Sequence, residues 1–232
     1  MNNRVGAVIV AAGKGSRMGT PESKQYLLLE GKPILVHTLL QFEQMTLIDE
    51  IVLVVGAQDV ERCTAWIKTY GLQKITKIVA GGAERQFSVY QGLLALNADW
   101  VFIHDGVRPF VTEERVRACY EAAVRHGAAV LAVSVKDTIK QVNEAGRIEH
   151  TPDRRSLWAI QTPQAFRYAD VVRAHEEAQR EQFVGTDDSM LVERLGLPVY
   201  VVKGDYTNIK ITTPDDLVSA EFWLQQMREE QQ

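Results

Sequence analysis

Short apolar runs alternate along the chain with longer segments in which apolar residues recur every three or four positions. Unbroken apolar runs are typical of buried parallel strands, and the longer pattern is typical of amphipathic helices. We therefore expect a strand at each apolar run. The runs lie at residues 5–10, 51–55, 75–80, 100–104, 128–135 and 199–203.

Three helix starts are marked in the sequence. Pro33 begins a helical pattern that continues to about Met45, and proline suits a first helical turn. Thr112 precedes two glutamates and predicts the N-cap of a helix to about residue 126. Thr213, followed by a proline and two aspartates, predicts the start of a last helix, towards residue 227. This order of elements predicts an α/β, Rossmann-like fold, a mostly parallel sheet flanked by helices on both faces.

Residues 136–160 break the alternation. Two short alternating stretches flank residues 143–146, where Asn-Glu-Ala-Gly predicts a hairpin turn. A hairpin here cannot bury both faces on the sheet, so we expect a projecting arm that packs against something else, such as a second subunit. The alternative is a loosely held surface loop, which the need to bury the arm's apolar residues disfavours. These residues are Ile139, Val142, Ile148, Leu157 and Trp158.

The chain has 232 residues, and we expect a single domain over 1–232 with the arm as its one projection. A net charge of −4 provides no overall basic field, which argues against a nucleic-acid partner. No apolar run approaches membrane-spanning length, and the first strand begins within a few residues of the N-terminus. Cys63 and Cys119 lack metal-ligand spacing and are interpreted as reduced thiols. We expect a cytoplasmic protein without a membrane partner.

The first strand continues into a glycine-rich basic loop, AAGKGSRMG. The small residues Ala11, Ala12, Gly13 and Gly15 let an anionic ligand approach the main chain, whose N–H groups can form an anion-binding nest. The positive charges of Arg17 and Lys24 follow. A glycine-rich loop alone can be merely a tight turn, but the two added cations favour a nucleoside triphosphate site.

Two other phosphate motifs fit this loop poorly. It reads GxGxxxG rather than GxGxxG, and it lacks the GK[ST] ending of a P-loop. A dinucleotide site usually has an acidic residue at the end of the second strand, and here no acid follows before Asp59. A dehydrogenase is therefore disfavoured.

The loop after the third strand reads GGAERQFS. Gly82 leaves backbone groups free to contact a flat ligand edge, and Arg85 and Ser88 fall one helical turn apart. A strand-to-helix turn with a surface arginine is the alternative.

The fourth strand ends in HDGVRP. Asp105 is well placed to hold Mg²⁺ through its water shell, and Arg108 offers planar donors to a phosphate. A simple Asp-Gly turn with an arginine counterion is the alternative. His104 is interpreted as a packing residue, because no second His or Cys lies at ligand spacing. Asp187 or its neighbour Thr186 is interpreted as a helix cap rather than as part of a metal pair.

These motifs, in this order, resemble the 2-C-methyl-D-erythritol 4-phosphate cytidylyltransferases of the non-mevalonate isoprenoid pathway. The resemblance covers nearly the whole chain, through AAGKGSRMG, SKQY, GGAERQFSV, HDGVRP, VKDT, DRRSLW, QTPQAF, GTDDSMLVE and NIKITTPDDL. It implies an enzyme that uses CTP and Mg²⁺, and a homodimer in which each arm reaches the neighbouring site. Ala83 and Val107 depart mildly from the family pattern and put only details of cytidine contact in doubt.

The resemblance also implies roles for single residues. Arg17 and Lys24 would stabilise the transition state, and Asp105 would lie near the metal, the ribose and the acceptor. Two sets of binding residues complete the expected site. The nucleotide set is Ala11, Ala12, Gly13, Gly15, Gly82, Arg85 and Ser88, and the acceptor set is Arg154, Lys210, Arg108, Thr138, Thr162 and Thr186, with Thr138 and Arg154 acting across the dimer.

Two other functions stay open at this point. A polyol-phosphate enzyme, such as a ribitol 5-phosphate cytidylyltransferase, would use the same groups on a different acceptor. A nucleotide-binding regulator without turnover would need no paired cations at the α-phosphate.

Overall fold

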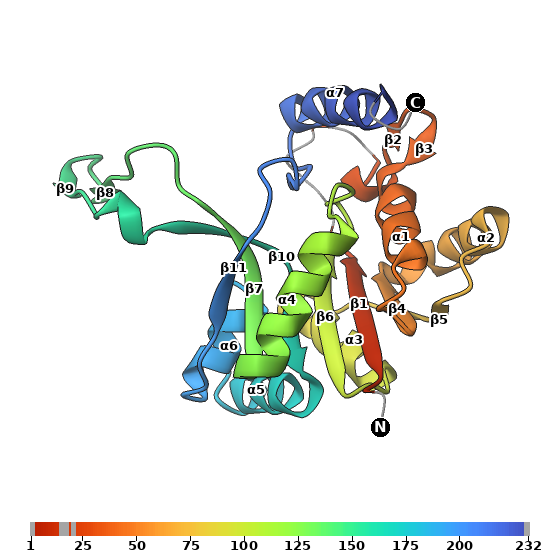
Figure 1. The fold of residues 1–232 in the computed structure, drawn as a ribbon, viewed down its shortest axis with the longest axis horizontal. Coiled ribbons are helices and arrows are strands. Elements are labelled where there is room, and N and C mark those ends of the chain that lie inside the picture. The colour runs from red at the N-terminus through yellow and green to blue at the C-terminus, as the bar shows by residue number, and fades with distance from the viewer. Residues whose placement is uncertain (1–2, 14–18, 20–21, 230–232) are drawn as a thin grey trace.

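A seven-stranded sheet forms the centre of the protein (Figure 1). The structure, a computed structural model, describes residues 3–13, 19 and 22–229. Its strand order is β11-β7-β10-β6-β1-β4-β5, and only β10 runs against the other six. The mostly parallel sheet expected from the sequence is thus confirmed. The strands are β1 (Val5–Ala11), β4 (Glu50–Val55), β5 (Ile75–Ala80), β6 (Trp100–Asp105), β7 (Ala128–Ser134), β10 (Trp158–Arg167) and β11 (Tyr200–Lys203).

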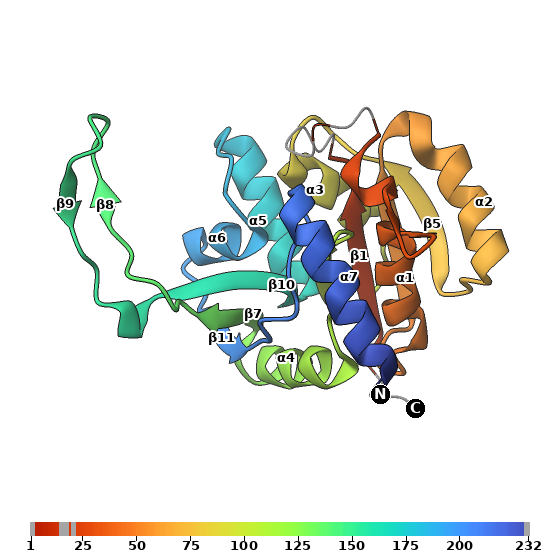
Figure 2. The same ribbon diagram turned by 90° about the horizontal axis from the view of Figure 1, so that it is seen from above.

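Helices cover both faces of the sheet (Figure 2). One face packs on α1 (Ile34–Gln44), α2 (Val60–Tyr70) and α4 (Glu113–His126). The other face packs on α3 (Arg85–Ala95), α5 (Tyr168–Arg180) and α6 (Asp188–Arg194). Neighbouring side chains of β1 point to opposite faces, so Ile9 belongs to the first apolar cluster and Val8 to the second. None of the described helices is long and apolar enough to cross a bilayer.

The last helix, α7 (Pro214–Glu229), begins where the cap at Thr213 predicts. The Asp216 amide donates to Thr213 Oγ1, and the Asp216 carboxylate accepts from the amides of Thr212 and Thr213. The helix packs over the small β2 (Leu28–Leu29) and β3 (Lys32–Pro33) pair in a third apolar cluster (Figure 1). It therefore lies across the chain segments that follow β1 and β6.

Strand β10 was not expected from the sequence. Its middle reads Gln-Thr-Pro-Gln, which interrupts the apolar pattern of a central strand. These side chains are nevertheless buried, because they hydrogen-bond inside the protein: Gln161 donates to the carbonyl of Asp205, and Gln164 donates to the carboxylate of Asp187. The register with β7 shifts between Ile160 and Gln164, and such an irregularity accommodates a proline within a sheet.

The predicted hairpin is formed by β8 (Gln141–Val142) and β9 (Ile148–His150). Asn143 closes the turn by accepting from the amides of Ala145 and Arg147, and Gly146 has a φ of +77°. In both views the hairpin stands away from the sheet (Figures 1 and 2). Residues 158–160, which the sequence assigns to the arm, belong instead to β10. Within this chain, Ile139, Val142, Ile148 and Trp158 remain 39–56% exposed.

Candidate nucleotide-binding site

A pocket of about 160 Å³ lies at the carboxyl ends of β1 and β6. These two strands are neighbours, with Val10 paired to Asp105, although the chain visits β4 and β5 between them. Ligands of open α/β sheets bind where strand order reverses in this way. The pocket's described lining consists of Val10, Ala11, Ala12, Gly13, Lys24, Gln25, Gly82, Ala83, Glu84, Arg85, Ser88, Asp105, Val107 and Lys210.

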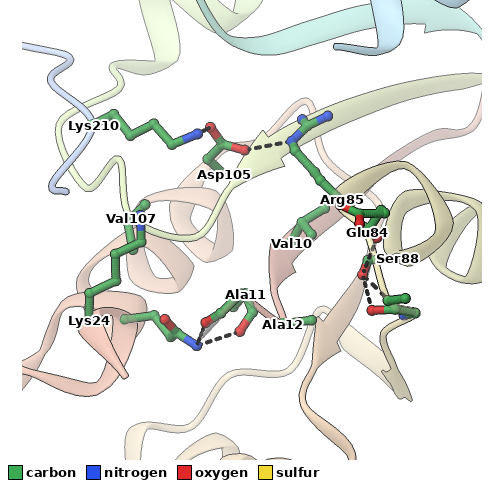
Figure 3. A pocket seen from close by; sticks show the side chains of 14 residues that line it. Val10, Ala11, Ala12, Lys24, Glu84, Arg85, Ser88, Asp105, Val107 and Lys210 are labelled. Carbon is green, nitrogen blue, oxygen red and sulfur yellow. Dashed lines mark hydrogen bonds and ion pairs between the residues drawn. The ribbon is translucent and has the colours of Figure 1, made fainter. Parts of the chain in front are cut away.

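Gln25 holds the start of the first loop. Its Nε2 donates to the carbonyl oxygen of Ala11 at 2.8 Å and to that of Gly13 at 2.9 Å. Lys24, one residue earlier in the short helix η2 (Lys24–Tyr26), reaches towards Val107 in the pocket (Figure 3). Because Gln25 is anchored in this way, its neighbour Lys24 lies at the pocket wall. Gly15 and Arg17 lie outside the described residues.

The second loop packs tightly against the first. A Cβ on Gly81 would lie 2.4 Å from the Cβ of Ala12 and 2.7 Å from Oγ of Ser88, so only glycine fits. The amide of Gly82 donates to Oγ of Ser88 at 3.1 Å, and this hydroxyl donates to the carbonyl of Glu84. Ser88 thus fixes the loop as well as lining the pocket.

Asp105 sits among three cations (Figure 3 shows Arg85 and Lys210). Its Oδ1 lies 3.1 Å from Nε of Arg85, and its Oδ2 lies 2.8 Å from Nζ of Lys210. Nε of Arg108 is 3.8 Å from the same Oδ2. These groups come from α3, from the turn after β6 and from the segment between β11 and α7.

Burial by itself would raise the pKa of Asp105. The charges of Arg85, Lys210 and Arg108 outweigh burial and hold this pKa far below its usual range. Burial likewise opposes the charge of Arg85, but two carboxylates raise the pKa of its guanidinium. The pocket therefore holds an aspartate that is ionised at neutral pH and surrounded by three cationic side chains.

Arg108 occupies a different place from the one expected for a phosphate ligand. It is outside the pocket lining and only 9% exposed, and its Nη1 donates to the carbonyl of Asn208 at 2.7 Å. Burial lowers the pKa of Arg108, while Asp105 opposes that shift. In this structure Arg108 joins the turn after β6 to the segment that carries Lys210.

Thr162, on β10, is outside the described pocket lining and contacts the end of β6. Its hydroxyl accepts from the amide of Asp105 at 3.0 Å and hydrogen-bonds Nδ1 of His104 at 3.1 Å. His104 is fully buried, and Nε2 contacts the carbonyl of Arg108, as suits a packing residue. Both side chains support the end of β6.

Three of the expected acceptor residues lie away from the pocket of this chain. Thr138 and Arg154 are exposed on the arm, where Nη1 of Arg154 donates to the carbonyl of Lys136 at 2.6 Å. Thr186 is exposed before α6, with its hydroxyl 3.6 Å from Sδ of Met190. Asp187, not Thr186, caps α6 by accepting from the amide of Met190.

The structure adds residues that the sequence reading did not assign to the site. Val10 and Glu84 line the pocket, and Gln25 orders the loop that begins at Ala11. Gln25 belongs to the SKQY motif beside Lys24, which was a signal for its importance. The side-chain amide of Gln25 meets the carbonyls of Ala11 and Gly13 only once the chain has folded, and composition and spacing do not reveal such a contact.

Asp105 is a reasonable partner for hydrated Mg²⁺. Within the described part of the chain, no cluster of three or more His, Cys, Asp or Glu side chains forms a metal site. Mg²⁺ is commonly held by one or two carboxylates together with water and substrate phosphates. An ionised carboxylate can accept from several donors at once. The carboxylate of Asp105 therefore fits a metal whose other ligands are mainly phosphate and water oxygens.

Comparisons with known proteins agree with this geometry. A family model described as 2-C-methyl-D-erythritol 4-phosphate cytidylyltransferase matches residues 5–226. The protein of that name from Alkaliphilus metalliredigens is 49% identical, over 99% of this chain and 97% of its own. The one from Syntrophus aciditrophicus is 51% identical, over 97% of each chain.

Solved structures show the same similarity. The crystal structure of 4-diphosphocytidyl-2C-methyl-D-erythritol synthase from Anaerococcus prevotii is 34% identical and has a TM-score of 0.85, over 96% of this chain and 99% of that one. The 2-C-methyl-D-erythritol 4-phosphate cytidylyltransferase from Thermus thermophilus is 33% identical with a TM-score of 0.77, over 94% and 98%. The chain belongs to the 2-C-methyl-D-erythritol 4-phosphate cytidylyltransferase family and is a nucleotidyltransferase.

Proposed function

We propose that this chain transfers the cytidylyl group of CTP to 2-C-methyl-D-erythritol 4-phosphate and releases pyrophosphate, a step in the non-mevalonate synthesis of isoprenoid precursors. The observation that carries the proposal is the charge arrangement at the pocket. Lys24 and Lys210 line it together with Asp105 and Arg85, at the carboxyl ends of β1 and β6. Such a pocket suits a reaction between two phosphorylated substrates.

The nucleophile in this reaction needs no catalytic base. A phosphate monoester is already anionic near neutral pH, so its oxygen can attack the α-phosphorus of CTP as the bond to pyrophosphate breaks. The enzyme's task is to bring a dianion to a polyanion and to stabilise the charge that develops at the α-phosphate. Positive side chains close to both phosphates perform that task.

Lys24 and Arg17 supply the charge at the triphosphate. One cation about 4 Å from an anion contributes about 4 kcal/mol at an effective dielectric constant near 20. Enzymes typically lower a barrier by about 8–23 kcal/mol. Two such side chains and one metal ion therefore account for much of the required stabilisation, whereas one cation does not.

The uncharged part of the pocket receives the cytidine. Ala11, Ala12, Gly13, Gly82 and Ser88 present small side chains and backbone groups there, which lets a flat base approach the main chain. Gly15 and Arg85 complete the proposed nucleotide contacts. The tight packing of Gly81 on Ala12 holds the two loops against each other beside these groups.

Mg²⁺ is the proposed cofactor, with Asp105 as its protein partner and triphosphate oxygens as its other ligands. Bound there, the metal would neutralise phosphate charge. Asp105 itself is kept ionised by Arg85 and Lys210, so it can accept from the water shell of a cation or from a ribose hydroxyl. Asp105→Asn should therefore raise the Mg²⁺ concentration that half-maximal turnover requires.

The acceptor site is proposed to be shared between two subunits. Lys210 supplies a cation from the same chain, while Arg154 and Thr138 sit on an arm that projects away from this pocket (Figure 2). Exposed Val142 and Ile148 on the arm favour packing against a partner copy. We therefore propose a homodimer in which each arm reaches the other subunit's pocket.

The remaining acceptor residues have less direct roles in this proposal. Thr162 and Arg108 hold the ends of the segments that carry Asp105 and Lys210. Thr186 sits on the loop before α6.

Free, buried Cys63 and Cys119 fit a reducing compartment, which supports the proposal of a cytoplasmic enzyme.

Pyrophosphate release from each of CTP, UTP, ATP and GTP, with 2-C-methyl-D-erythritol 4-phosphate or ribitol 5-phosphate as acceptor, tests the proposal. We expect release with CTP and methylerythritol phosphate, and far less in every other combination. A clear preference for ribitol phosphate would overturn the acceptor assignment. If no combination of nucleotide and acceptor releases pyrophosphate, the proposed activity is overturned.

A further inference from the structure

A chain of polar contacts connects the pocket to side chains buried beyond its lining. Arg85 on α3 contacts Asp105 through Nε at 3.1 Å and Asp188, the first residue of α6, through Nη1 at 2.7 Å. Asp188 accepts in turn from Nε2 of His175 on α5 at 3.1 Å. Three helices and the end of β6 are thus joined by one chain of polar contacts.

The inner half of this chain is removed from solvent. The side chains of Asp188 and His175 are each 1% exposed, whereas that of Arg85 is 29% exposed at the pocket. Burial would raise the pKa of Asp188, but Arg85 and His175 outweigh it and hold the pKa below its usual range. A buried carboxylate is costly unless it is paired. Asp188 is paired on both of its oxygens.

The contacts fix the direction of the Arg85 guanidinium. Its planar fork of donors is held at two points, by Asp188 on the inner side and by Asp105 on the pocket side. A lysine in this place could not reach both carboxylates in the same way. With Arg85 fixed, Oδ1 of Asp105 is held, and Oδ2 faces Lys210.

We infer that Asp188 and His175 are positioning residues of the transferase site: they hold Arg85 against Asp105 and so set the orientation of the carboxylate that the substrates meet. The inference rests on the proposed function, since it concerns that same pocket. Neither side chain lines the pocket. Both therefore act through Arg85.

The competing explanation is a purely structural ion pair between α3, α5 and α6. It predicts that loss of the pair lowers stability and nothing else. Positioning predicts in addition a loss of kcat/KM in protein that is fully folded. The neighbouring Asp187 provides a matched comparison, because it caps the same helix and its contacts are with Met190, Gln164 and Ser189 rather than with Arg85.

The first test compares Asp188→Asn with Asp187→Asn. Both should lower the denaturation midpoint, and kinetics are then measured well below both midpoints. We expect Asp188→Asn to reduce kcat/KM about 10- to 100-fold, as loss of supporting contacts behind a site often does, and Asp187→Asn to stay near wild type. Equal kcat/KM values for the two folded variants would overturn the inference.

The second test uses His175, in case Asp188→Asn does not fold. His175→Gln keeps an N–H donor that can reach Oδ1 of Asp188, whereas His175→Leu leaves that oxygen unpaired. We expect His175→Leu to lose kcat/KM and His175→Gln to recover most of it. The same kinetic loss in both variants, or in neither, would contradict positioning through Asp188.

A third measurement separates this inference from the proposed activity. A crystal structure of folded His175→Leu should show Arg85 displaced from Asp105, whatever reaction the enzyme performs. An unmoved Arg85 would overturn the inference while leaving the activity intact. Wild-type protein that releases no pyrophosphate would overturn the activity, and the structural result would still decide the role of the buried chain.

Discussion

The Nζ of Lys210 lies 2.8 Å from Oδ2 of Asp105. Asp105 ends β6, and Lys210 follows β11, 105 residues later in the chain, so the tertiary fold alone brings them together. The ion pair gives Lys210 a partner before any substrate binds. An incoming phosphate can replace or share that partner, which makes Lys210 a cation available to the acceptor.

Lys210→Ala should therefore impair acceptor binding more than turnover. Hydrogen bonds to charged groups contribute about 1.5–3 kcal/mol, so we expect the KM for methylerythritol phosphate to rise about 10- to 100-fold. The KM for CTP should change less. Steady-state kinetics with each substrate varied in turn provide the measurement. Lys203→Ala, at an exposed position of β11, is the control, and an unchanged acceptor KM in Lys210→Ala would refute the assignment.

Lys24→Ala should impair turnover more than acceptor binding. Its charge is needed most where negative charge develops in the transition state, so kcat should fall about 10²- to 10³-fold. Acceptor binding should weaken far less. Single-turnover kinetics together with acceptor titration would separate the two effects. Lys68→Ala, at an exposed position of α2, should behave as wild type, and equal losses of kcat and acceptor affinity in Lys24→Ala would count against the role.

A mixture of Lys24→Ala and Arg154→Ala subunits should regain activity if the arm acts across a dimer. Each variant alone carries a defect in every site. A mixed dimer has one site with both defects and one with neither, so random mixing should restore about one quarter of wild-type activity. Pyrophosphate release before and after subunit exchange measures this. No recovery in verified mixed dimers would argue for a site within one chain.

Gly92→Ala should destabilise the protein, although alanine is the better helix former. A Cβ at residue 92 of α3 would lie 2.4 Å from Cγ1 of Val8 and 2.8 Å from Cγ2 of Val54. We expect a loss of about 1–3 kcal/mol from this overpacking, beyond the ~1 kcal/mol that alanine gains in a helix. Urea unfolding measures the difference. Gln91→Ala, exposed on the same helix, should lose no comparable stability.

His104 should make stability fall as the pH drops. Burial lowers the pKa of His104 from 6.5 to about 4, so the unfolded chain binds a proton between these values that the folded protein resists. The stabilisation is full above pH 6.5 and is lost as the pH falls towards 4, by about 2 kcal/mol between pH 7 and pH 5.

Unfolding curves of wild type and His104→Gln at pH 7 and pH 5 would measure that contribution. The pKa of His37 is also lowered by burial, so it contributes in the same direction in both proteins and cancels in the comparison. The variant should lose less stability than wild type over this interval. Identical losses in the two proteins would show that His104 is not the group responsible.

Periodicity was sufficient to predict most of the architecture. The apolar runs at β1, β4 and β6 lie on strands that are buried by helices, so their pattern follows directly from the fold. The caps at Thr112 and Thr213 depend on contacts within four residues, which the sequence contains. β10 escaped prediction because its buried polar side chains are satisfied by partners distant in the chain, such as Asp205 and Asp187.

The helix caps, the hairpin turn and the residue types at the strand ends could be predicted from the sequence alone, because each depends on local backbone preference or residue type. The partners of those residues became known only from the folded chain. It placed Lys210 on Asp105, turned Arg108 inward towards Asn208, and set Asp188 and His175 behind Arg85. Such pairings depend on how crossovers bring distant strand ends and helices together, and no local pattern in the chain specifies that geometry.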